Sequence, residues 1–391
     1  MRASTGRSAT AFLLFTIGLH SPVPLAAHDV VPVEPRVVNS CSAAATQWLD
    51  SLTAEQRTLA QWSFDEDKRK DWHYLNNLPP IYMRKEGLAL KSMEAGQRIL
   101  AHRLIRCGLS SQGYQKSTGI MILESIGWGQ LPDQGVQVAK QISDTVGTMD
   151  AYWLAVFGEP GSGEPWQWQL EGHHLALNFT FAGEAISVTP TFLGTRPNVI
   201  QTGEFAGWHA MGFEKDHAFR LLSSLSSGQL QQAVIGETVA NNIFTEPDRL
   251  NVLESYEGLA AKELNAAQRS VLWELILEYV NNYEAEIAAE RIAEIQADGI
   301  ENIYFAWMGA TGSVEAPVYF RVHGPSVLIE FANASNLGGR SAPKLNADGT
   351  LKRGKHDIAD PNHIHSIYLN PKRNFGRDLL REHYLNEHGP D

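Results

Sequence analysis

Two separate stretches of the chain alternate apolar and polar residues with a period of two, the pattern of β-strands that are covered on one face. In residues 174–181 (HLALNFTF) the leucines and phenylalanines fall on one side and the remaining residues on the other. Gly183-Glu184 then turns the chain into AISVTPTF, which predicts a β-hairpin, and WQWQL alternates in the same way upstream. Four later runs complete the pattern: IYFAWMG, APVYFRVHG, SVLIEFAN and HIHSIYL. We therefore expect two β blocks, at residues 151–195 and 301–370.

Helical patterns separate these blocks, in residues 39–150 and 216–298 and again in 377–384. Thr53 followed by Gln56 is a capping box, which marks a helix start. The order of the blocks predicts an α+β fold, with a mainly helical N-terminal half packed on a largely antiparallel sheet to which both β blocks contribute. We find no internal repeat in the sequence, and we expect a single domain over residues 28–391.

Residues 1–27 have the three parts of a secretory signal peptide: a positive start, the short apolar run AFLLFTIGL, and small residues before the expected cleavage after Ala27. We therefore expect an exported protein, periplasmic or extracellular. Later in the chain, no apolar run approaches the roughly 20 residues that a membrane-spanning helix needs, so we expect no membrane insertion. Cleavage would leave His28 first, with an amine and an imidazole that together are able to chelate copper.

The formal charge of −12 becomes −14 when the signal peptide is removed, because it contains Arg2 and Arg7 but no acid. An acidic protein of this kind is a poor partner for nucleic acid. We expect a small-molecule, peptide or glycan partner instead, and the oligomeric state stays open. The chain has two cysteines, Cys41 and Cys107. They would either form a disulfide between two N-terminal helices or remain as buried thiols.

Two histidine motifs, Gly172-His173-His174 and His363-Ile364-His365, form the strongest candidate site. Side chains two apart in a strand point the same way, so His363 and His365 would present both imidazoles to one face. Such a pair is a common way to hold a metal ion with neutral nitrogens. His173 and His174 would point in opposite directions, and His174 is the better candidate for the same centre because it shares a face with Asn178.

A three-histidine site with an open position suits a divalent ion such as Zn, Cu or Fe. Glu330, on the polar face of its predicted strand, is our candidate fourth ligand, general base or partner of an imidazole. The alternatives are that these histidines hydrogen-bond within the sheet core, or that they bind a ligand without metal.

A second cluster lies in the loop around Trp72, His73 and Tyr74, with Arg84 further along. Aromatic and polar residues packed into a loop are suited to a substrate wall, with Arg84 as an anion-binding group and Asn178 as a further contact. A loop that is simply held in place by its aromatic residues explains the same pattern. Arg196 also flanks the loop after the predicted hairpin, but nothing in the pattern ranks it higher.

Three functions fit these residues. The first is a metalloenzyme that hydrolyses an ester, amide or lactone bond, with Glu330 as base. The second is a copper or iron oxidoreductase that uses the same histidines. The third is a secreted binding protein that captures a ligand such as a glycan with its ten tryptophans and its histidines. The chain contains no G-x-S-x-G, P-loop or HExxH motif.

Several of these runs together resemble one known family. WQWQLEGHHLALNFTFAGEAISVTPTFLGTRP, VYFRVHGPSVLIEFAN and NHIHSIYLNPKRNFG are similar to the DUF3500 family of bacterial and fungal proteins, over residues 40–388. The resemblance implies that the GHH and HIH motifs belong to one recurring domain. It transfers no catalytic residue, because the family is defined by sequence alone. NPKRNFG departs from the aspartate-rich version that is typical of the family.

Overall fold

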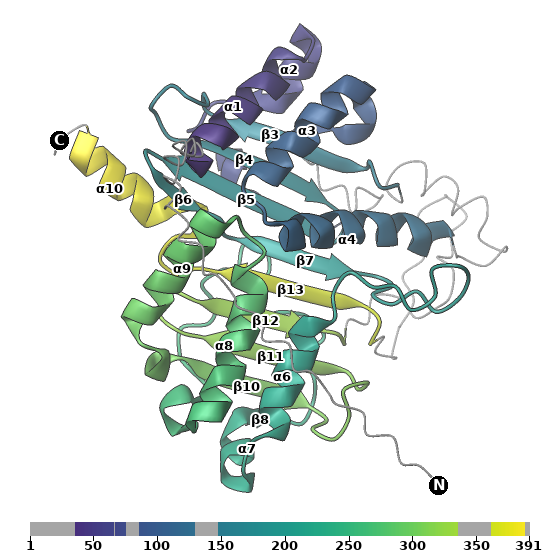
Figure 1. Cartoon of the computed structure of the whole chain (residues 1–391), viewed down its shortest axis with the longest axis vertical. Coiled ribbons are helices and arrows are strands. Elements are labelled where there is room, and N and C mark those ends of the chain that lie inside the picture. Colours follow the sequence, from purple (N-terminus) through teal and green to yellow (C-terminus); the bar gives the residue numbers. More distant parts are fainter. Residues whose placement is uncertain (1–35, 66, 76–85, 130–147, 335–360, 388–391) are drawn as a thin grey trace, which may run out of the picture. The chain divides into compact units, whose positions relative to one another are not determined.

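The computed structural model describes residues 36–65, 67–75, 86–129, 148–334 and 361–387. They belong to one compact unit, Arg36–Asp391. The predicted α+β class is confirmed, since both β blocks join in one sheet, which has thirteen strands among the described residues, beside a layer of helices (Figure 1). Within the described part of the chain, no helix is both long enough and apolar enough to cross a membrane.

Ten strands form the main path of the sheet, in the order β1-β3-β4-β5-β7-β13-β12-β11-β10-β8. Their bounds are β1 Gln61–Trp62, β3 Tyr152–Phe157, β4 Trp166–Gly172, β5 Leu175–Ala182, β7 Thr191–Thr195, β8 Val234–Gly236, β10 Tyr304–Gly309, β11 Val318–His323, β12 Leu328–Ala332 and β13 Ile364–Leu369. The short strands β2 (Leu88–Ala89), β6 (Ala185–Ser187) and β9 (Leu259–Ala260) lie off this path. All neighbours along the path are antiparallel except the two outermost pairs, β1–β3 and β8–β10, which are parallel.

Helices cover one face of the sheet (Figure 1). They are α1 Val37–Asp50, α2 Ala54–Ala60, α3 Ala95–Cys107, α4 Ser111–Gly129, α6 Phe213–Ser223, α7 Ser227–Ala233, α8 Ala266–Val280 and α9 Ala285–Asp298, with α10 Arg377–Glu387 near the C-terminus. Apolar side chains from this layer and from the facing side of the strands form the main core. A second, smaller core lies on the other face, where loop residues such as Trp72, Tyr74 and Ile243 pack on the strands.

Ten elements of the first half recur in the same order in the second half, within the described residues, so the expectation of no internal repeat was wrong. α1, α2, β1, β2, α3, α4, β3, β4, β5 and β7 correspond in turn to α6, α7, β8, β9, α8, α9, β10, β11, β12 and β13. The strand order reads the same from either edge, and the halves meet where β7 pairs with β13. The strands β8 and β9 also interrupt the stretch 216–298, which we expected to be helical.

One segment keeps the repeat visible in the sequence: GLALKSMEAGQR begins at Gly87, and GLAAKELNAAQR begins at Gly258. Both glycines have positive φ, +108° and +96°. A Cβ atom would lie 2.5 Å from the Leu154 carbonyl oxygen in the first half and 2.3 Å from the Phe305 oxygen in the second. Both positions therefore need glycine for the same reason, a close approach of two backbones.

A matching set of glutamine hydrogen bonds, which we call the glutamine brace, also appears in both halves. Gln97 donates to the carbonyl oxygen of Ser51 at 2.8 Å, and Gln268 donates to that of Ser224 at 2.7 Å. Each glutamine also bonds the glutamine of a capping box, Gln56 in the first half and Gln229 in the second. Buried amides rarely pair in this way by accident, because every donor and acceptor must be satisfied at once.

Cys41 and Cys107 form a disulfide that joins α1 to α3, so the first of our two alternatives is confirmed. Their Cα atoms are 5.2 Å apart, and 66 positions separate them in sequence. A bridge over a loop of this length stabilises the fold mainly by restricting the unfolded chain.

We predict that the double variant Cys41→Ala, Cys107→Ala loses about 4 kcal/mol of unfolding free energy, the chain-entropy value for a loop of this length. Urea unfolding followed by circular dichroism measures the change, with reduced wild-type protein as a second route to the same state. Equal unfolding midpoints for oxidised and reduced protein would show that the bridge is not a stabilising element.

Candidate metal centre

His363 and His365 lie at the start of β13, where the two halves of the sheet meet. β13 pairs with β7, and His365 stands opposite Gly194. The side chains of Ile367 and Leu369, two and four residues further on, pack in the smaller core. Because alternate residues share a face, both histidines point to that side of the sheet, as the HxH spacing predicts.

His174 reaches the same place from the turn between β4 and β5. We expected His174 to be part of a strand, but it is not. Its φ is +64°, and β5 begins at the next residue. Its backbone is held on both sides: its amide donates to the carbonyl oxygen of Tyr74 at 2.9 Å, and its own carbonyl accepts from the amide of Gly194 at 2.7 Å. A left-handed conformation in a residue other than glycine costs free energy, and such positions cluster at functional sites.

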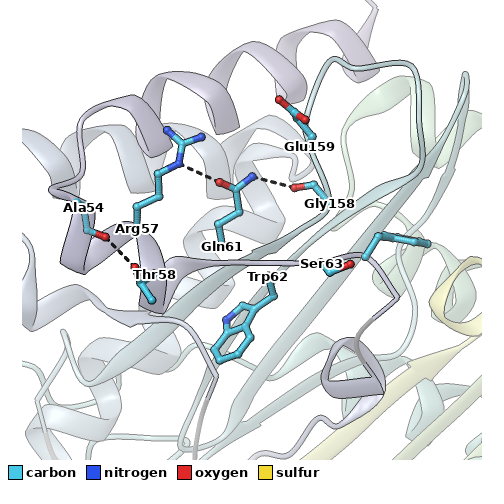
Figure 2. A pocket seen from close by; sticks show the side chains of 9 residues that line it. Ala54, Arg57, Thr58, Gln61, Trp62, Ser63, Gly158 and Glu159 are labelled. Atoms are coloured by element: carbon cyan, nitrogen blue, oxygen red, sulfur yellow. Dashed lines mark hydrogen bonds between the residues drawn. The ribbon is translucent and has the colours of Figure 1, made fainter.

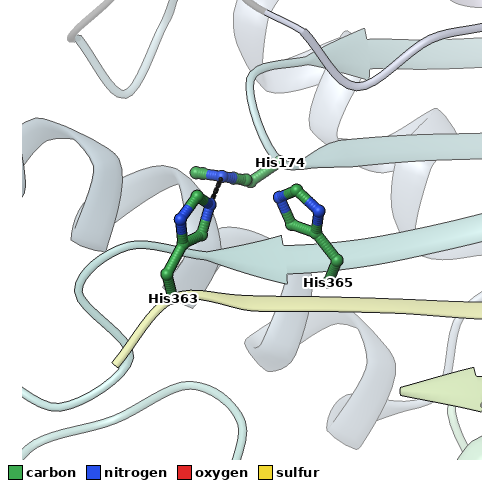
Figure 3. Close-up of side chains that lie close together, drawn as sticks. All are labelled: His174, His363 and His365. Atoms are coloured by element: carbon green, nitrogen blue, oxygen red, sulfur yellow. Dashed lines mark hydrogen bonds between the residues drawn. The ribbon is translucent and has the colours of Figure 1, made fainter. Parts of the chain in front are cut away.

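The three imidazoles converge, as Figure 3 shows. One candidate ligand atom from each of His174, His363 and His365 lies within 4.8 Å of the other two. The Nε2 atoms of His174 and His363 are 3.0 Å apart. Two nitrogens that bind one tetrahedral ion at 2.0–2.1 Å would be roughly 3.3 Å apart, so the observed spacing fits a shared metal ion closely.

Two of the three rings are oriented by hydrogen bonds from Nδ1 to an acceptor oxygen. Nδ1 of His174 donates to Oε2 of Glu124 at 3.2 Å, and Nδ1 of His365 donates to Oδ1 of Asn242 at 2.7 Å. Because these oxygens only accept, each Nδ1 carries the proton and each Nε2 has a lone pair, which in His174 accepts a hydrogen bond from Nε2 of His363. Metal-binding histidines are held in this way. Nδ1 of His363 is buried and makes no hydrogen bond within the described residues.

Burial keeps the imidazoles neutral. Desolvation is the largest cause that lowers the pKa of His174, to about 4, and the pKa values of His363 and His365 fall well below their ordinary value for the same reason. The proximity of the other histidines lowers all three pKa values further. Since a metal binds only the neutral ring, the centre favours the form that coordinates.

His173 belongs to a neighbouring ligand group, which does not include His363 and His365. Its ring stacks on that of His174 with centroids 3.9 Å apart, and its Nδ1 bonds the second oxygen of Glu124. Burial raises the pKa of Glu124, but the charge of His173 and the bonds from both histidines outweigh it and lower that pKa. Glu124, His173 and His174 also form a possible ligand group, which shares His174 with the first.

The aromatic loop forms a wall beside the centre. The Tyr74 ring meets the His365 ring edge-on at 5.0 Å and stacks on Phe192 at 3.9 Å. Its hydroxyl donates to Glu246 at 3.0 Å and accepts from Asn242 at 2.9 Å. Trp72 is buried in the same small core, and the backbone amide of His73 donates to Glu171 at 3.2 Å. Arg84, the predicted anion-binding group of this loop, lies outside the described residues.

Glu330 has a different task from the one we expected. Its carboxylate accepts from the backbone amides of Phe244 and Thr245 at 2.8 and 2.9 Å, from the Tyr319 hydroxyl at 2.6 Å, and from the Thr245 hydroxyl. The structure does not bring it into the histidine cluster. Its oxygens anchor the segment that carries Asn242, so we no longer assign it the role of general base.

Asn178 is likewise occupied within the fold. It is buried on β5, and its side-chain amide donates to the carbonyl oxygen of Pro190 at 2.8 Å. It shares a sheet face with neighbouring Ala176, as the alternation predicts, but the hydrogen bond gives it a structural role.

A surface pocket elsewhere is lined by α2 and β1 (Figure 2). Arg57 donates to Gln61 at 2.9 Å, and Gln61 donates to the carbonyl oxygen of Gly158 at 3.0 Å. None of the clustered histidines lines it. Because these polar groups bond one another, the pocket offers less chemistry than the histidine cluster.

A family model described as "Protein of unknown function (DUF3500)" matches residues 34–377. The chain belongs to the DUF3500 family. No curated protein and no solved structure matches it. The match spans both halves of the repeat, so the GHH and HIH motifs belong to one family unit.

Sequence reasoning missed two residues of this DUF3500 site, Glu124 and Asn242. Glu124 lies near the end of a helix and Asn242 in a loop, where no periodic pattern marks them. The repeat would have helped with Glu124. Counted from the start of α4, it occupies the place that Asp298 occupies in α9. Asp298 instead bonds Lys372 at 2.9 Å.

We predict that Glu124→Gln weakens metal binding by roughly 10- to 100-fold, because the His174 ring loses its charged partner. Asp298→Asn, the matched change in the other half, should leave metal affinity unchanged. Competition with a chromophoric chelator measures both. Equal affinities for the two variants would show that Glu124 does not support the ligand.

We also predict that the metal-free protein loses stability as the pH falls from about 7 to 5. The unfolded histidines take up protons near pH 6.5 and the buried ones do not, so acid favours unfolding. The loss should reach a few kcal/mol, because a shift of one pKa unit corresponds to about 1.4 kcal/mol and three histidines contribute. Urea unfolding in EDTA measures it. His365→Asn should flatten this pH dependence, and an unchanged slope would contradict the assignment.

Proposed function

We propose that this DUF3500 protein is an exported metalloenzyme with one divalent transition-metal ion bound by Nε2 of His174, His363 and His365. In this proposal the site hydrolyses an ester, amide or lactone bond. The convergence of three neutral imidazoles, two of them oriented by partners on Nδ1, is the observation that carries the proposal.

The donor set favours hydrolysis in a simple way. Three neutral ligands leave the full charge on the ion, and such an ion lowers the pKa of bound water to about 7. The chain itself would orient the imidazoles through Glu124 and Asn242. It would also exclude bulk water, because His174, His363 and His365 are all buried. No separate carboxylate base is needed in this scheme, which agrees with the other task of Glu330.

Export is supported by two observations. The first 27 residues have the pattern of a signal peptide, and the disulfide between Cys41 and Cys107 is of a kind that persists in oxidising compartments.

One observation favours a copper or iron oxidoreductase as the second candidate. The phenol ring of Tyr74 lies against the ring of His365, with centroids 5.0 Å apart, so an oxidisable side chain adjoins a metal ligand. The hydrolytic reading assigns no chemical role to this tyrosine.

Elemental analysis of the purified mature protein tests the proposal. We expect one zinc, copper or iron per chain after reconstitution. His363→Ala and His365→Ala should each weaken metal binding by more than about 100-fold, since the loss of a residue that only hydrogen-bonds a ligand already costs roughly 10- to 100-fold. His209→Ala, which changes an exposed histidine outside the cluster, should keep the metal. Wild-type protein without stoichiometric metal would refute the centre.

The identity of the metal separates the two reactions. A colourless zinc protein that hydrolyses p-nitrophenyl esters, and loses this activity in the His365→Ala variant, supports the hydrolase. A copper or iron signal in electron paramagnetic resonance, together with oxygen consumption, supports the oxidoreductase and contradicts hydrolysis.

A further inference from the structure

The side-chain amide of Asn242 decides which nitrogen of His365 is available to a metal ion. Its Oδ1 accepts a hydrogen bond from Nδ1 of His365 at 2.7 Å. This bond requires the tautomer that has its proton on Nδ1 and a lone pair on Nε2. If the amide were turned round, its NH2 group would face Nδ1 and favour the other tautomer, in which Nε2 carries the proton and cannot bind a metal ion.

Glu246 fixes the orientation of this amide because a carboxylate only accepts hydrogen bonds. Its Oε1 accepts from Nδ2 of Asn242, and also from the Tyr74 hydroxyl at 3.0 Å. A turned amide would bring the carbonyl oxygen of Asn242 against the carboxylate, where neither group has a proton to donate. Hydrogen bonds to a charged group are roughly twice as strong as those between neutral groups, so the carboxylate gives the orientation its strongest support.

The Tyr74 hydroxyl is directed by the same carboxylate. Because it donates its proton to Glu246, its oxygen is turned to accept from Nδ2 of Asn242, at 2.9 Å. Without Glu246 this hydroxyl would be free to donate to Asn242 instead. The backbone amide of Ile243 adds a neutral contribution in the same sense, since it donates to Oδ1 of Asn242 at 2.9 Å.

The backbone holds the carboxylate of Glu246 in place. The amide of the preceding residue, Thr245, donates to Glu330 at 2.9 Å, and the amide of Arg249 donates to the carbonyl oxygen of Glu246 at 2.9 Å. The other carboxylate oxygen, Oε2, lies 3.7 Å from the exposed guanidinium of Arg249. Because exposed ion pairs of this kind contribute little, the position of Glu246 does not depend on Arg249.

We infer that Glu246 is a positioning residue of the metal centre: through Asn242 it selects the tautomer of His365 that binds the metal ion. This inference rests on the proposed function and adds to it a residue that is not a ligand. His174 needs no such control, because its partner Glu124 is a carboxylate and has no donor end. The partner of His365 is an amide with two different ends, so a further group must orient it.

The tautomer of His365 tests this inference in the metal-free protein. Long-range nitrogen–proton NMR spectra of histidine-labelled protein distinguish a protonated Nδ1 from a protonated Nε2, and His365→Asn assigns the signals. We expect the Nδ1-protonated form in wild-type protein and a mixture of both forms in Glu246→Leu, which removes the acceptor. Glu246→Gln keeps an acceptor oxygen and should retain most of the wild-type form. Arg249→Gln, which removes only the outer ion pair, should leave the spectrum unchanged.

Metal affinity tests the same role through a double-mutant cycle. In the wild-type background, Glu246→Leu should weaken cobalt binding by roughly 10-fold, the lower end of the range for residues that support a ligand. In an Asn242→Asp background, residue 242 accepts from His365 in either orientation, and Glu246 only repels it. Glu246→Leu should then leave the affinity unchanged or raise it. Titration with cobalt, followed by visible absorption, measures the four dissociation constants.

The outcomes separate this inference from the proposed function. Equal losses of cobalt affinity in the two backgrounds would show that Glu246 only supports the fold, which overturns the inference. An unchanged His365 tautomer in Glu246→Leu overturns it as well. If wild-type protein binds no metal, the proposed function fails, and the tautomer measurement still decides whether Glu246 controls His365.

Discussion

The antiparallel pairing of β7 with β13 is the interaction on which the rest of the structure depends. It joins two halves that otherwise repeat the same elements, and it makes one continuous sheet of them. The same pairing places Gly194 opposite His365, and the amide of Gly194 bonds the carbonyl of His174. Three imidazoles from distant parts of the chain therefore meet only because the two halves are joined at this register. A slip of one residue would turn His363 and His365 to the helical face.

The repeat also shows that the fold does not need the histidines. The turn that contains His174 in the first half contains Ser326 in the second, and Glu124 corresponds to Asp298. Both turns connect equivalent strands in one sheet. Burying imidazoles and a carboxylate costs free energy unless every group is paired. Because the second half connects its equivalent strands without these groups and without a left-handed residue in the turn, a purely structural role explains the cluster poorly, and a functional role explains why it occurs in one half.

The sequence predicted the parts of the site that follow from strand alternation. The HxH spacing placed His363 and His365 on one face, and the strand blocks indicated a shared sheet. The alternation also placed Glu330 and Asn178 on the strand face opposite the apolar side chains. It could not identify their partners, because Phe244, Thr245 and Pro190 come from loops whose course depends on tertiary packing. Glu124 was missed for a similar reason. It lies near the end of α4, and the helical periodicity does not show which residue of that helix contacts the histidines.

The repeat escaped detection because the halves share clear identity only where the backbone demands it. Gly87 and Gly258 are kept by close approach to a neighbouring strand, and Gln97 and Gln268 by their braces. Elsewhere, strand positions need only an apolar side chain of suitable size, and many residues meet that requirement. Packing therefore preserves the architecture while the sequences of the two halves diverge.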